Sequence, residues 1–599
     1  MTTYLNSLAD KRIIPNIVIR LMGQYFSIRA VDSGLVIPAA NIGLVSSLNV
    51  SPTTIDPFRP STTIQDYSFK LLDSANIITA MFGGNPQYFQ NELVEIWVGR
   101  NLIPFGDSMD FSEYMKLSNT YVTKCSYQDN SYSFQAREEK DRLSKGAYST
   151  QTKLAVDILA ATTVITVQDV SNLPTNGFIK IDDEFISYTG IIGSNLQNCI
   201  RGEQGTVPAN HDLGSDVYLG EVVQDNAINI LLKLLISSGG GGAYDTLIDG
   251  AAIDQSLIDI AQMEQVRDEF FTATPWNFKL IIYNLDDLKK FIDEEICYPL
   301  GIRLRANSNA KIGLALLDRN IFDIDAPVLT HDTILKKPSF DIDNNKIKNR
   351  LRIFWDWSDA ANNYLKISEF TDADSITQFG KTDFFEMKFK GIRDSLGGAT
   401  LVNDISLLFL GRFAFPKPTI GIDAQMDVSN LNVGDKTQVV TTLIPNTDGV
   451  LDFYDVVEDI SRAINFTTSD VKFQLAFTSF TGVRQCYLAP SDTIISFTNQ
   501  KTVTIGAGRG ANWRKGWKVR LYDNTTRDDN GVQVNEIASV VGDVITFVDN
   551  WVTVLVNNQY RLRFADYDEV AETQKRFCFM SLNGNNFYDG KKTYQISFG

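Results

Sequence analysis

Short alternating runs of β-branched and aromatic residues recur along most of this 599-residue chain, and they constrain its fold more than any other feature. In residues 66–71 and 131–136, apolar and polar side chains alternate with a period of two. That period gives a strand one buried face and one solvated face. The 37 Phe and 22 Tyr supply side chains that suit strands. The pattern predicts a mainly β protein with a smaller α/β part.

A helical period replaces the alternation after residue 225. Apolar residues of the segment 226–236 recur at spacings of three and four, and Gly239 to Gly242 follow as a stop signal. Further helices are expected near 253–261, 266–271 and 285–297, the last with Asn284 or Asp286 as N-cap. A hairpin is expected at 302–316 and a helix near 401–415. Strands return from residue 346, so helices are concentrated in the middle of the chain.

Two segments, Ala161 to Val223 and Gln485 to Asp568, share a local pattern. In each, a glycine and an aromatic residue open a strand, at Gly177-Phe178 and Gly516-Trp517, and a glycine turn closes a hairpin. We interpret both as small β domains inserted into a host fold. The predicted organisation is a first β-barrel domain (1–150), an inserted β domain (151–224), an α/β domain (225–345), a second β-barrel domain (346–484), a second inserted β domain (485–568) and a C-terminal return to the host (569–599).

Charge and cysteine usage exclude several classes of protein. The net charge of −17 argues against nonspecific binding to phosphate. The five cysteines are scattered without a CxxC pair, so we expect reduced, packed thiols. The first residues lack the layout of a secretory signal, and no apolar tract has the length of a membrane span. We therefore expect the chain to fold where it is made, in the cytoplasm of the producing cell.

Motifs for catalysis or cofactor binding are weak. The chain has only two histidines, His211 and His331, and both are expected in structural turns. GAGRG, at residues 506–510, lacks a following helix, so a turn is favoured over a phosphate site. Four acidic groups could suggest an acid/base pair or a calcium loop, but solvated edges and turns are favoured: Asp182-Asp183-Glu184, Glu294-Glu295, residues 341–345 and residues 528–531. We predict no catalytic residue, no cofactor and no metal ion.

Three tryptophans of the second inserted segment are the candidates for surface contact. Trp513, Trp517 and Trp551 could offer ring faces to a sugar, which would make the chain a receptor- or glycan-binding protein. Packing in a core or hairpin is the competing interpretation, and it is favoured. A hydrolase of cell-wall glycan that uses a carboxylate pair is the third hypothesis.

Four stretches carry a resemblance to a known family. They are the helix and loop Ile230 to Leu247, the helix and hairpin Phe291 to Asp318, the tail end Ala571 to Gly599, and the first inserted segment with its DEFISYTG and RGEQGT. Together they resemble the tail hub (baseplate hub or tail tip) proteins of long-tailed bacteriophages, the gp27-like hub family. Residues 1–150 are similar only in style.

The resemblance implies a structural virion protein that is not an enzyme. Such a hub is a homotrimer at the distal end of the tail, where two β-barrel domains per subunit make a pseudo-sixfold ring on the hexameric tail tube. Its partners would be the distal tail protein or tube, the tape-measure protein and tip or fibre proteins. DNA would pass through the ring without specific binding during ejection, and the acidic charge fits a channel that does not retain phosphate. The inserted segments would be free to contact other tip proteins or the host, and we expect no stable insertion into a membrane.

Overall fold

The structure is a computed structural model, and it describes most of the chain in separate stretches. These are residues 15–27, 45–56, 58, 63–73, 76–81, 83, 86–100, 111, 114–272, 276–307, 309–316, 328–343, 346–416, 418–426, 431–445, 451, 453–466, 470–477, 483–487, 491–510, 513, 515, 518–523, 528–529, 533–564, 577–581, 586–588 and 593–595. The fold is mainly β, with 46% strand and 18% helix, as the alternation predicts. Two compact units divide the chain: residues 1–318 with 327–481, and residues 319–326 with 482–599.

The first sheet of the larger unit has seven antiparallel strands that curl into a half-barrel. Its order is β2 (Gln24–Ser27), β1 (Pro15–Leu21), β6 (Leu93–Arg100), β7 (Met115–Gln128), β8 (Ser131–Glu138), β5 (Asp66–Leu72) and β3 (Val45–Val50). Helix α2 (Ile77–Met81) and the 3-10 turn Pro86–Phe89 follow β5. Buried aromatics such as Phe69 and Phe134 fill one face, while Ser68 and Gln135 alternate with them on the exposed face.

The second curled sheet is built mainly from residues 329–477. It runs β20 (Leu329–Thr330), β26 (Lys436–Thr441), β27 (Phe453–Asn465), β28 (Asp470–Phe477), β25 (Thr419–Gln425) and β21 (Ser339–Asp341). The short strand β4 (Thr53–Thr54) pairs with β27 through Ser461 and Arg462. A strand from the first block therefore belongs to the second sheet, and this pairing ties the two half-barrels together within the larger unit.

The largest hydrophobic core of the described residues takes buried side chains from the helices α3, α4 and α8. The helices are α3 (Ala227–Ile236), α4 (Ile260–Phe270), α5 (Leu288–Ile292), α6 (Tyr298–Leu300), α7 (Ala373–Phe379) and α8 (Gly398–Phe413), with 3-10 or π turns at Glu139–Leu143, Gln255–Leu257, Asp293–Cys297 and Asp394–Leu396. The strands are β17 (Asn277–Tyr283), β18 (Ile302–Ala306), β19 (Ile312–Leu316), β22 (Arg350–Ser358), β23 (Asn363–Thr371) and β24 (Phe384–Lys388). The helix predicted at 226–236, the hairpin at 302–316 and the helix near 401–415 are confirmed.

One predicted helix cap is wrong. Neither Asn284 nor Asp286 begins α5; the carboxylate of Asp287 accepts the backbone N–H of Lys290 at 2.9 Å. Asn284 instead has a positive φ of 41° in the turn after β17. The aspartate one position later is the residue whose carboxylate reaches a free N–H of the first helical turn.

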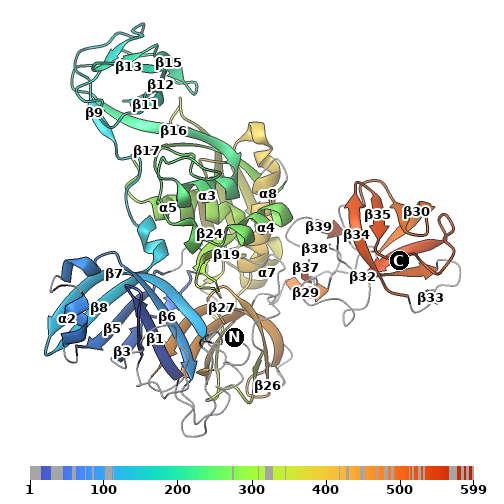
Figure 1. The fold of residues 1–599 in the computed structure, drawn as a ribbon. Coiled ribbons are helices and arrows are strands. Elements are labelled where there is room, and N and C mark those ends of the chain that lie inside the picture. Colours follow the sequence, from blue (N-terminus) through green and yellow to red (C-terminus); the bar gives the residue numbers. More distant parts are fainter. Residues whose placement is uncertain are drawn as a thin grey trace. The chain divides into compact units, whose positions relative to one another are not determined.

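The first inserted segment shares a strand with the body of the larger unit. Its strands are β9 (Gln151–Lys153), β10 (Ile165–Thr166), β11 (Gly177–Ile181), β12 (Glu184–Tyr188), β13 (Gly190–Ile192), β14 (Asn195–Gln197), β15 (Ile200–Glu203) and β16 (Asp216–Asn226). The start of β16 pairs with β11, and residues 220–226 pair with β17. The labels β11, β16 and β17 in Figure 1 follow this continuous sheet. The segment is therefore attached by hydrogen-bonded sheet as well as by its chain ends.

The smaller unit contains a closed barrel of six strands. Its order is β32 (Lys518–Asp523), β34 (Asn535–Val541), β35 (Val544–Phe547), β31 (Thr502–Ile505), β30 (Ser491–Asn499) and β36 (Tyr560–Phe564), and pairing of β36 with β32 closes the ring. Strand β33 (Asp528–Asp529) pairs antiparallel with the end of β32. A separate four-stranded sheet joins β29 (Val483–Tyr487), β37 (Phe577–Ser581), β38 (Asn586–Tyr588) and β39 (Thr593–Gln595).

No helix in the described stretches is long and apolar enough to cross a membrane. The six domain ranges expected from the sequence stay predictions, since the contacts divide the chain into only two units.

Candidate functional site

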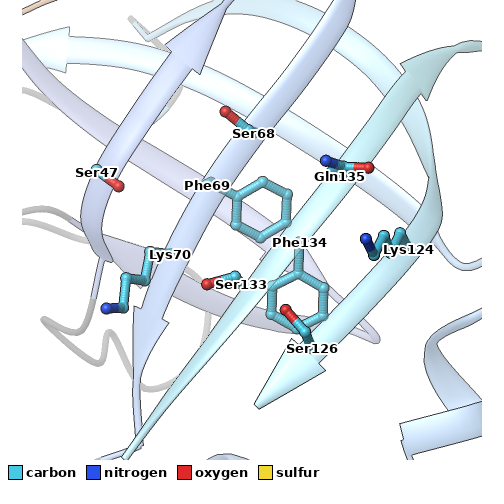
Figure 2. A pocket seen from close by; sticks show the side chains of 9 residues that line it. All are labelled: Ser47, Ser68, Phe69, Lys70, Lys124, Ser126, Ser133, Phe134 and Gln135. Atoms are coloured by element: carbon cyan, nitrogen blue, oxygen red, sulfur yellow. The ribbon is translucent and has the colours of Figure 1, made fainter. Parts of the chain in front are cut away.

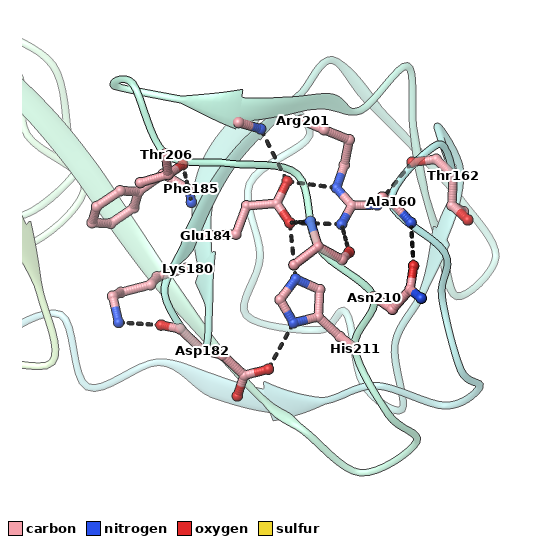
Figure 3. Close-up of polar contacts among 12 residues, drawn as sticks. Ala160, Thr162, Lys180, Asp182, Glu184, Phe185, Arg201, Thr206, Asn210 and His211 are labelled. Carbon is pink, nitrogen blue, oxygen red and sulfur yellow. Dashed lines mark hydrogen bonds and ion pairs between the residues drawn. The ribbon is translucent and has the colours of Figure 1, made fainter. Parts of the chain in front are cut away.

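A group of mostly buried charged side chains in the first inserted segment surrounds Glu184. A tight turn with Asp182 at φ 47° joins β11 to β12 and places Glu184 at the start of β12. Strand β15, which pairs with β12, carries Arg201. The loop after β15 returns to a backbone bridge between Ile158 and His211. Residues distant in sequence therefore meet around one carboxylate (Figure 3).

Five donors or ring nitrogens surround the two oxygens of Glu184. Arg201 donates from Nε to Oε1 at 2.8 Å and from Nη2 to Oε2 at 2.6 Å. The backbone N–H groups of Gly202 and Ala209 donate at 2.9 and 3.0 Å. Nε2 of His211 lies 2.9 Å from Oε2, and its Nδ1 lies 2.6 Å from Asp182. We call Asp182, Glu184, Arg201 and His211 the ionic cluster.

The electrostatic balance keeps Glu184 ionised. Burial by itself would raise the pKa of this carboxyl, because a charge loses its hydration there. Hydrogen bonds from Arg201, the Ala209 amide, His211 and the Gly202 amide outweigh that effect, so the pKa lies below its ordinary value. Glu184 is thus a permanent anion at neutral pH, held by fixed donors.

The same cluster joins two loops. The guanidinium of Arg201 donates to the carbonyls of Leu159 at 2.7 Å and Ala209 at 2.6 Å. The amide of Ala160 donates to the side chain of Asn210 at 2.9 Å. Loop 157–162 and loop 201–213 are therefore held together through Arg201 and a short backbone ladder.

This arrangement is suited to holding loops and not to catalysis. The side chains of Glu184, His211 and Arg201 are 1%, 2% and 6% exposed, so a substrate atom has no approach to them. Both ring nitrogens of His211 are already engaged. His211 has a structural role, as expected, but it lies buried at its backbone bridge with Ile158 and not at the surface. The sequence signal was a glutamate in an otherwise apolar strand, EFISY.

A second buried group of charges joins β18, α8 and β27 within the larger unit. Glu458 in β27 accepts from Nη1 of Arg303 in β18 at 2.6 Å, and from Nη2 of Arg412 in α8. All three side chains are at most 3% exposed. Next to them, burial raises the pKa of Asp459 in spite of the nearby Arg462. These pairs connect the second half-barrel to the helical layer and lie away from solvent.

A hollow of about 240 Å³ lies on the exposed face of the first half-barrel (Figure 2). Its polar lining consists of serines, Gln135 and the cations Lys70 and Lys124. The rings of Phe69 and Phe134, which also border it, belong to the buried core. The lining matches the solvated face that the alternation of β5 and β8 predicts, and no nucleophile–base pair is among it.

Two of the three tryptophan candidates lie in a core and not on the surface. Trp513 and Trp551 are each 3% exposed, in the core of the six-stranded barrel. The indole N–H of Trp513 donates to Asp492 at 2.7 Å, and Trp551 packs edge-to-face on Phe547. A closed barrel of this size needs large side chains to fill it, which explains their burial. Trp517 lies outside the described residues.

The GAGRG loop holds an anion from its own chain. The carboxylate of Asp543 accepts the N–H groups of Gly508 and Gly510, both at 2.9 Å. These bonds lower the pKa of Asp543. A Cβ at Gly510 would lie 1.8 Å from the carbonyl oxygen of Gly542, so only glycine fits there. The loop is a turn, as predicted, with its amides occupied by Asp543.

The described residues of the remaining acidic candidates do not combine into a site, and residues 344, 345, 530 and 531 lie outside the described stretches. Glu294 is exposed, while Glu295 is partly buried and accepts the N–H of Lys390 at 2.7 Å. Burial raises the pKa of Glu295 to about 7. Asp341 and Asp528 lie in short strands, and His331 is exposed in a turn. Within the described stretches, no group of three or more His, Cys, Asp or Glu side chains could hold a metal ion.

Three cysteines in the described stretches are free thiols. Cys199 and Cys297 are buried and Cys125 is partly buried. Burial raises the pKa of Cys125 and Cys199 to about 11 and raises that of Cys297 as well, so all three are poor nucleophiles. The backbones of Cys486 and Cys578 are register partners in β29 and β37.

Comparisons with known proteins give structural matches only. No protein-family model and no curated protein sequence matches this chain. Prophage tail protein gp18 from Listeria monocytogenes matches 77% of this chain and 94% of its own, with 12% identity and a TM-score of 0.34. A tail protein from Neisseria meningitidis covers 77% and 96% at 8% identity and TM-score 0.34. The 43 kDa tail protein of prophage MuSo2 from Shewanella oneidensis covers 77% and 98% at 9% identity and TM-score 0.30.

Proposed function

We propose that this chain is a structural protein of a bacteriophage tail, and that its specific role is the hub at the distal end of the tail. The observation that carries the proposal is the pair of curled half-barrels in one unit, each a sheet of mainly antiparallel strands. Three copies would present six such sheets, which is the number needed to continue a hexameric tube.

The stretches that resemble the hub family support the proposal by their positions in the fold. Residues 230–247 form most of α3 and the loop after it, in the main core. Residues 291–318 run from α5 into the hairpin of β18 and β19, the helix-to-hairpin arrangement that the resemblance implies. These stretches belong to the body of the larger unit. The tail end contributes β37 to β39 to the smaller unit.

The proposed assembly is a homotrimer within the virion. Its ring closes or adapts the tail tube, anchors tip or fibre proteins, and surrounds the path of the tape-measure protein and then DNA. The net charge of −17 supports passage without specific binding of DNA, because an acidic wall repels phosphate. The chain acts without catalysis in this proposal.

The direct test is the oligomeric state of the purified full chain. We expect particles of three times 67.0 kDa by mass photometry, and threefold rings with a central hole in negative-stain images. A monomer at all concentrations, with no ring on addition of purified tail tubes, would contradict the hub. Immunogold labelling of intact particles tests the position independently: label along the tube or on the head would contradict the distal end.

The glycan-binding alternative loses two of its three aromatic platforms, since Trp513 and Trp551 are buried. The hydrolase alternative loses support at both of its carboxylate candidates. Glu294 and Glu295 differ in exposure, and Glu295 accepts a backbone N–H. Glu184, near Asp182, is buried and bonded to Arg201. Release of reducing sugar from purified cell walls by the full chain would support the hydrolase alternative.

A further inference from the structure

The hollow on the solvated face of the first half-barrel is built by four neighbouring strands (Figure 2). The register places its polar side chains in two rows across β3, β5, β8 and β7. One row holds Ser47, Lys70, Ser133 and Ser126, and the next holds Ser68, Gln135 and Lys124. These side chains therefore share one face of the sheet, and we call them the lysine hollow.

The side chains of the lysine hollow are not used inside the protein. Within the described residues, neither an ion pair nor a side-chain hydrogen bond joins any of them to another group. By contrast, the next pair of positions along β5 and β8, Asp66 and Arg137, is joined by an ion pair of 2.8 Å. The lysine hollow therefore offers two ammonium groups and a set of neutral hydrogen-bonding groups to a ligand.

The local charge of the lysine hollow is opposite to that of the whole chain. None of the described residues that line it is acidic. The adjoining Asp66 is paired with Arg137, and the exposed Asp129 lies farther along, in the turn between β7 and β8. Exposed charges more than about 8 Å apart are largely screened at physiological ionic strength. Lys70 and Lys124 therefore outweigh the net charge of −17 for any group that enters the hollow.

The spacing of the two lysines describes the anion that fits. Lys70 and Lys124 are two strands and two residues apart, about 12 Å between Cα atoms at ordinary sheet spacings. Figure 2 shows them on opposite sides of the hollow, with Ser133 between them. Two carboxylates about four residues apart in an extended segment span the same distance. Nucleic acid fits less well, because its binders neutralise many phosphates with a broad basic surface.

The exposure of the lysines favours a partner that is held nearby. A small free anion would bind weakly, because pairs of exposed charges contribute little. A segment of a neighbouring protein in an assembly binds at high effective concentration, so a few such pairs are enough. Contact between the hollows of two copies would place lysine against lysine, which is unfavourable.

We propose that the lysine hollow is a docking site for an acidic segment of a different protein, with two carboxylates placed against Lys70 and Lys124. The serines and Gln135 between the lysines supply hydrogen bonds to the backbone or polar side chains of that segment. The inference rests on the proposed function only for the particle in which the partner is sought.

Zero-length carbodiimide crosslinking of purified particles tests the contact, because it joins a lysine amine only to a carboxylate that touches it. We expect Lys70 and Lys124 to crosslink to acidic residues about four positions apart in one segment of another protein. Lys145, which is exposed and unpaired within the described residues but lies outside the hollow, is the matched control and should not reach that segment. Crosslinks to a mass-labelled second copy of this chain, or none from either lysine, would overturn the proposal.

Charge reversal at one lysine, read at the other, gives the quantitative arm. In Lys70→Glu, we expect the crosslink from Lys124 to fall about tenfold, because a like charge then faces the acidic segment. Lys70→Arg keeps the charge and should keep that crosslink, and Lys145→Glu should leave it unchanged. Raising the salt concentration should weaken it. An unchanged yield in Lys70→Glu, or binding of an oligothymidylate to the full chain that Lys70→Glu abolishes, would contradict the docking site.

Failure of the docking site and failure of the tail function are distinguishable. Crosslinking is repeated in lysates of the producing cells, so the contact is measured even if the chain is absent from purified particles. Absence of the chain from those particles contradicts the tail function. Normal incorporation without a specific crosslink from Lys70 or Lys124 contradicts only the docking site.

Discussion

The two inserted segments share a sequence pattern but are built on different principles. The first, within residues 151–224, contributes to two open sheets, one of which continues through its own strand β16 onto β17 of the host, and it encloses the ionic cluster. The second, within residues 485–568, closes on itself as a six-stranded barrel filled by Trp513 and Trp551. Each uses one buried carboxylate to hold loops: Glu184 accepts Arg201, and Asp492 accepts Arg509 and Trp513. The two segments differ in how much their folded structure depends on that carboxylate.

We expect the largest effect from Glu184→Ala. The substitution leaves Arg201 buried without its anion, a loss of about 3–5 kcal/mol for a broken buried pair. The readout is hydrogen exchange of peptides covering 157–162 and 201–213 in the full chain, where protection should disappear. Asp183→Ala, at the exposed neighbouring position, should leave both peptides protected. Retained protection in Glu184→Ala would show that the loops do not depend on the cluster.

Asp492→Ala should have a smaller effect, because the barrel has a large apolar core of its own. The indole N–H of Trp513 loses a charged acceptor, which costs about 1.5–3 kcal/mol. Denaturant unfolding followed by tryptophan fluorescence should show an earlier transition for the smaller unit. Asp549→Ala removes an exposed carboxylate of the same barrel and should not shift it. A decrease in the free energy of unfolding as large as that expected for Glu184→Ala would contradict the difference between the two segments.

Gly510→Ala tests the close approach of the GAGRG loop to Gly542. The added methyl group would overlap the Gly542 carbonyl, and we expect a cost of about 1–3 kcal/mol from the backbone shift. Limited proteolysis of the full chain should cut near residues 506–510 more rapidly. Gly506→Ala, where the nearest atom is the flexible side chain of Arg509 at 3.2 Å, is the matched control. Equal proteolysis of the two variants would contradict the close approach.

The smallest effect is expected from mild acid. The pKa of Glu184 is lowered in the folded protein, so its contribution is complete above the unfolded value of about 4.3 and is lost as pH falls through the lower folded pKa. Arg201, His211 and Asp182 face this carboxylate. Between pH 7 and pH 4 the 201–213 peptide should lose little protection, and lose it steeply below. Glu184→Gln should remove this pH dependence. A loss of protection in the wild-type chain centred near pH 6 would contradict a lowered pKa of Glu184.

The local elements were predictable from sequence because their signals are local. The alternation in β5 and β8, the helical period of α3 and the hairpin of β18 and β19 each occupy a few consecutive residues. The ionic cluster was not predictable, since Glu184 and His211 are separated by 27 positions. A glutamate within an apolar strand was the available signal, and it does not identify its partner. The burial of Trp513 and Trp551 likewise depends on ring closure between β32 and β36.

By itself, the sequence determined that the chain is mainly β and where α3, α8 and the hairpin of β18 and β19 lie, and its charge and residue types favour a structural role over catalysis. The two helices expected near 253–261 and 266–271 are instead one helix, α4. Tertiary structure decided the rest. Strand β16 pairs both with β11 of the inserted segment and with β17 of the host. The carboxylate of Asp543 accepts the amides of the GAGRG loop, and Arg201 and His211 contact Glu184. The physical reason is distance along the chain. Periodicity reflects the environment of residues that are near one another in the sequence. The partner of a buried charge or of a shared strand can lie far away in the sequence, and only the fold brings the two together.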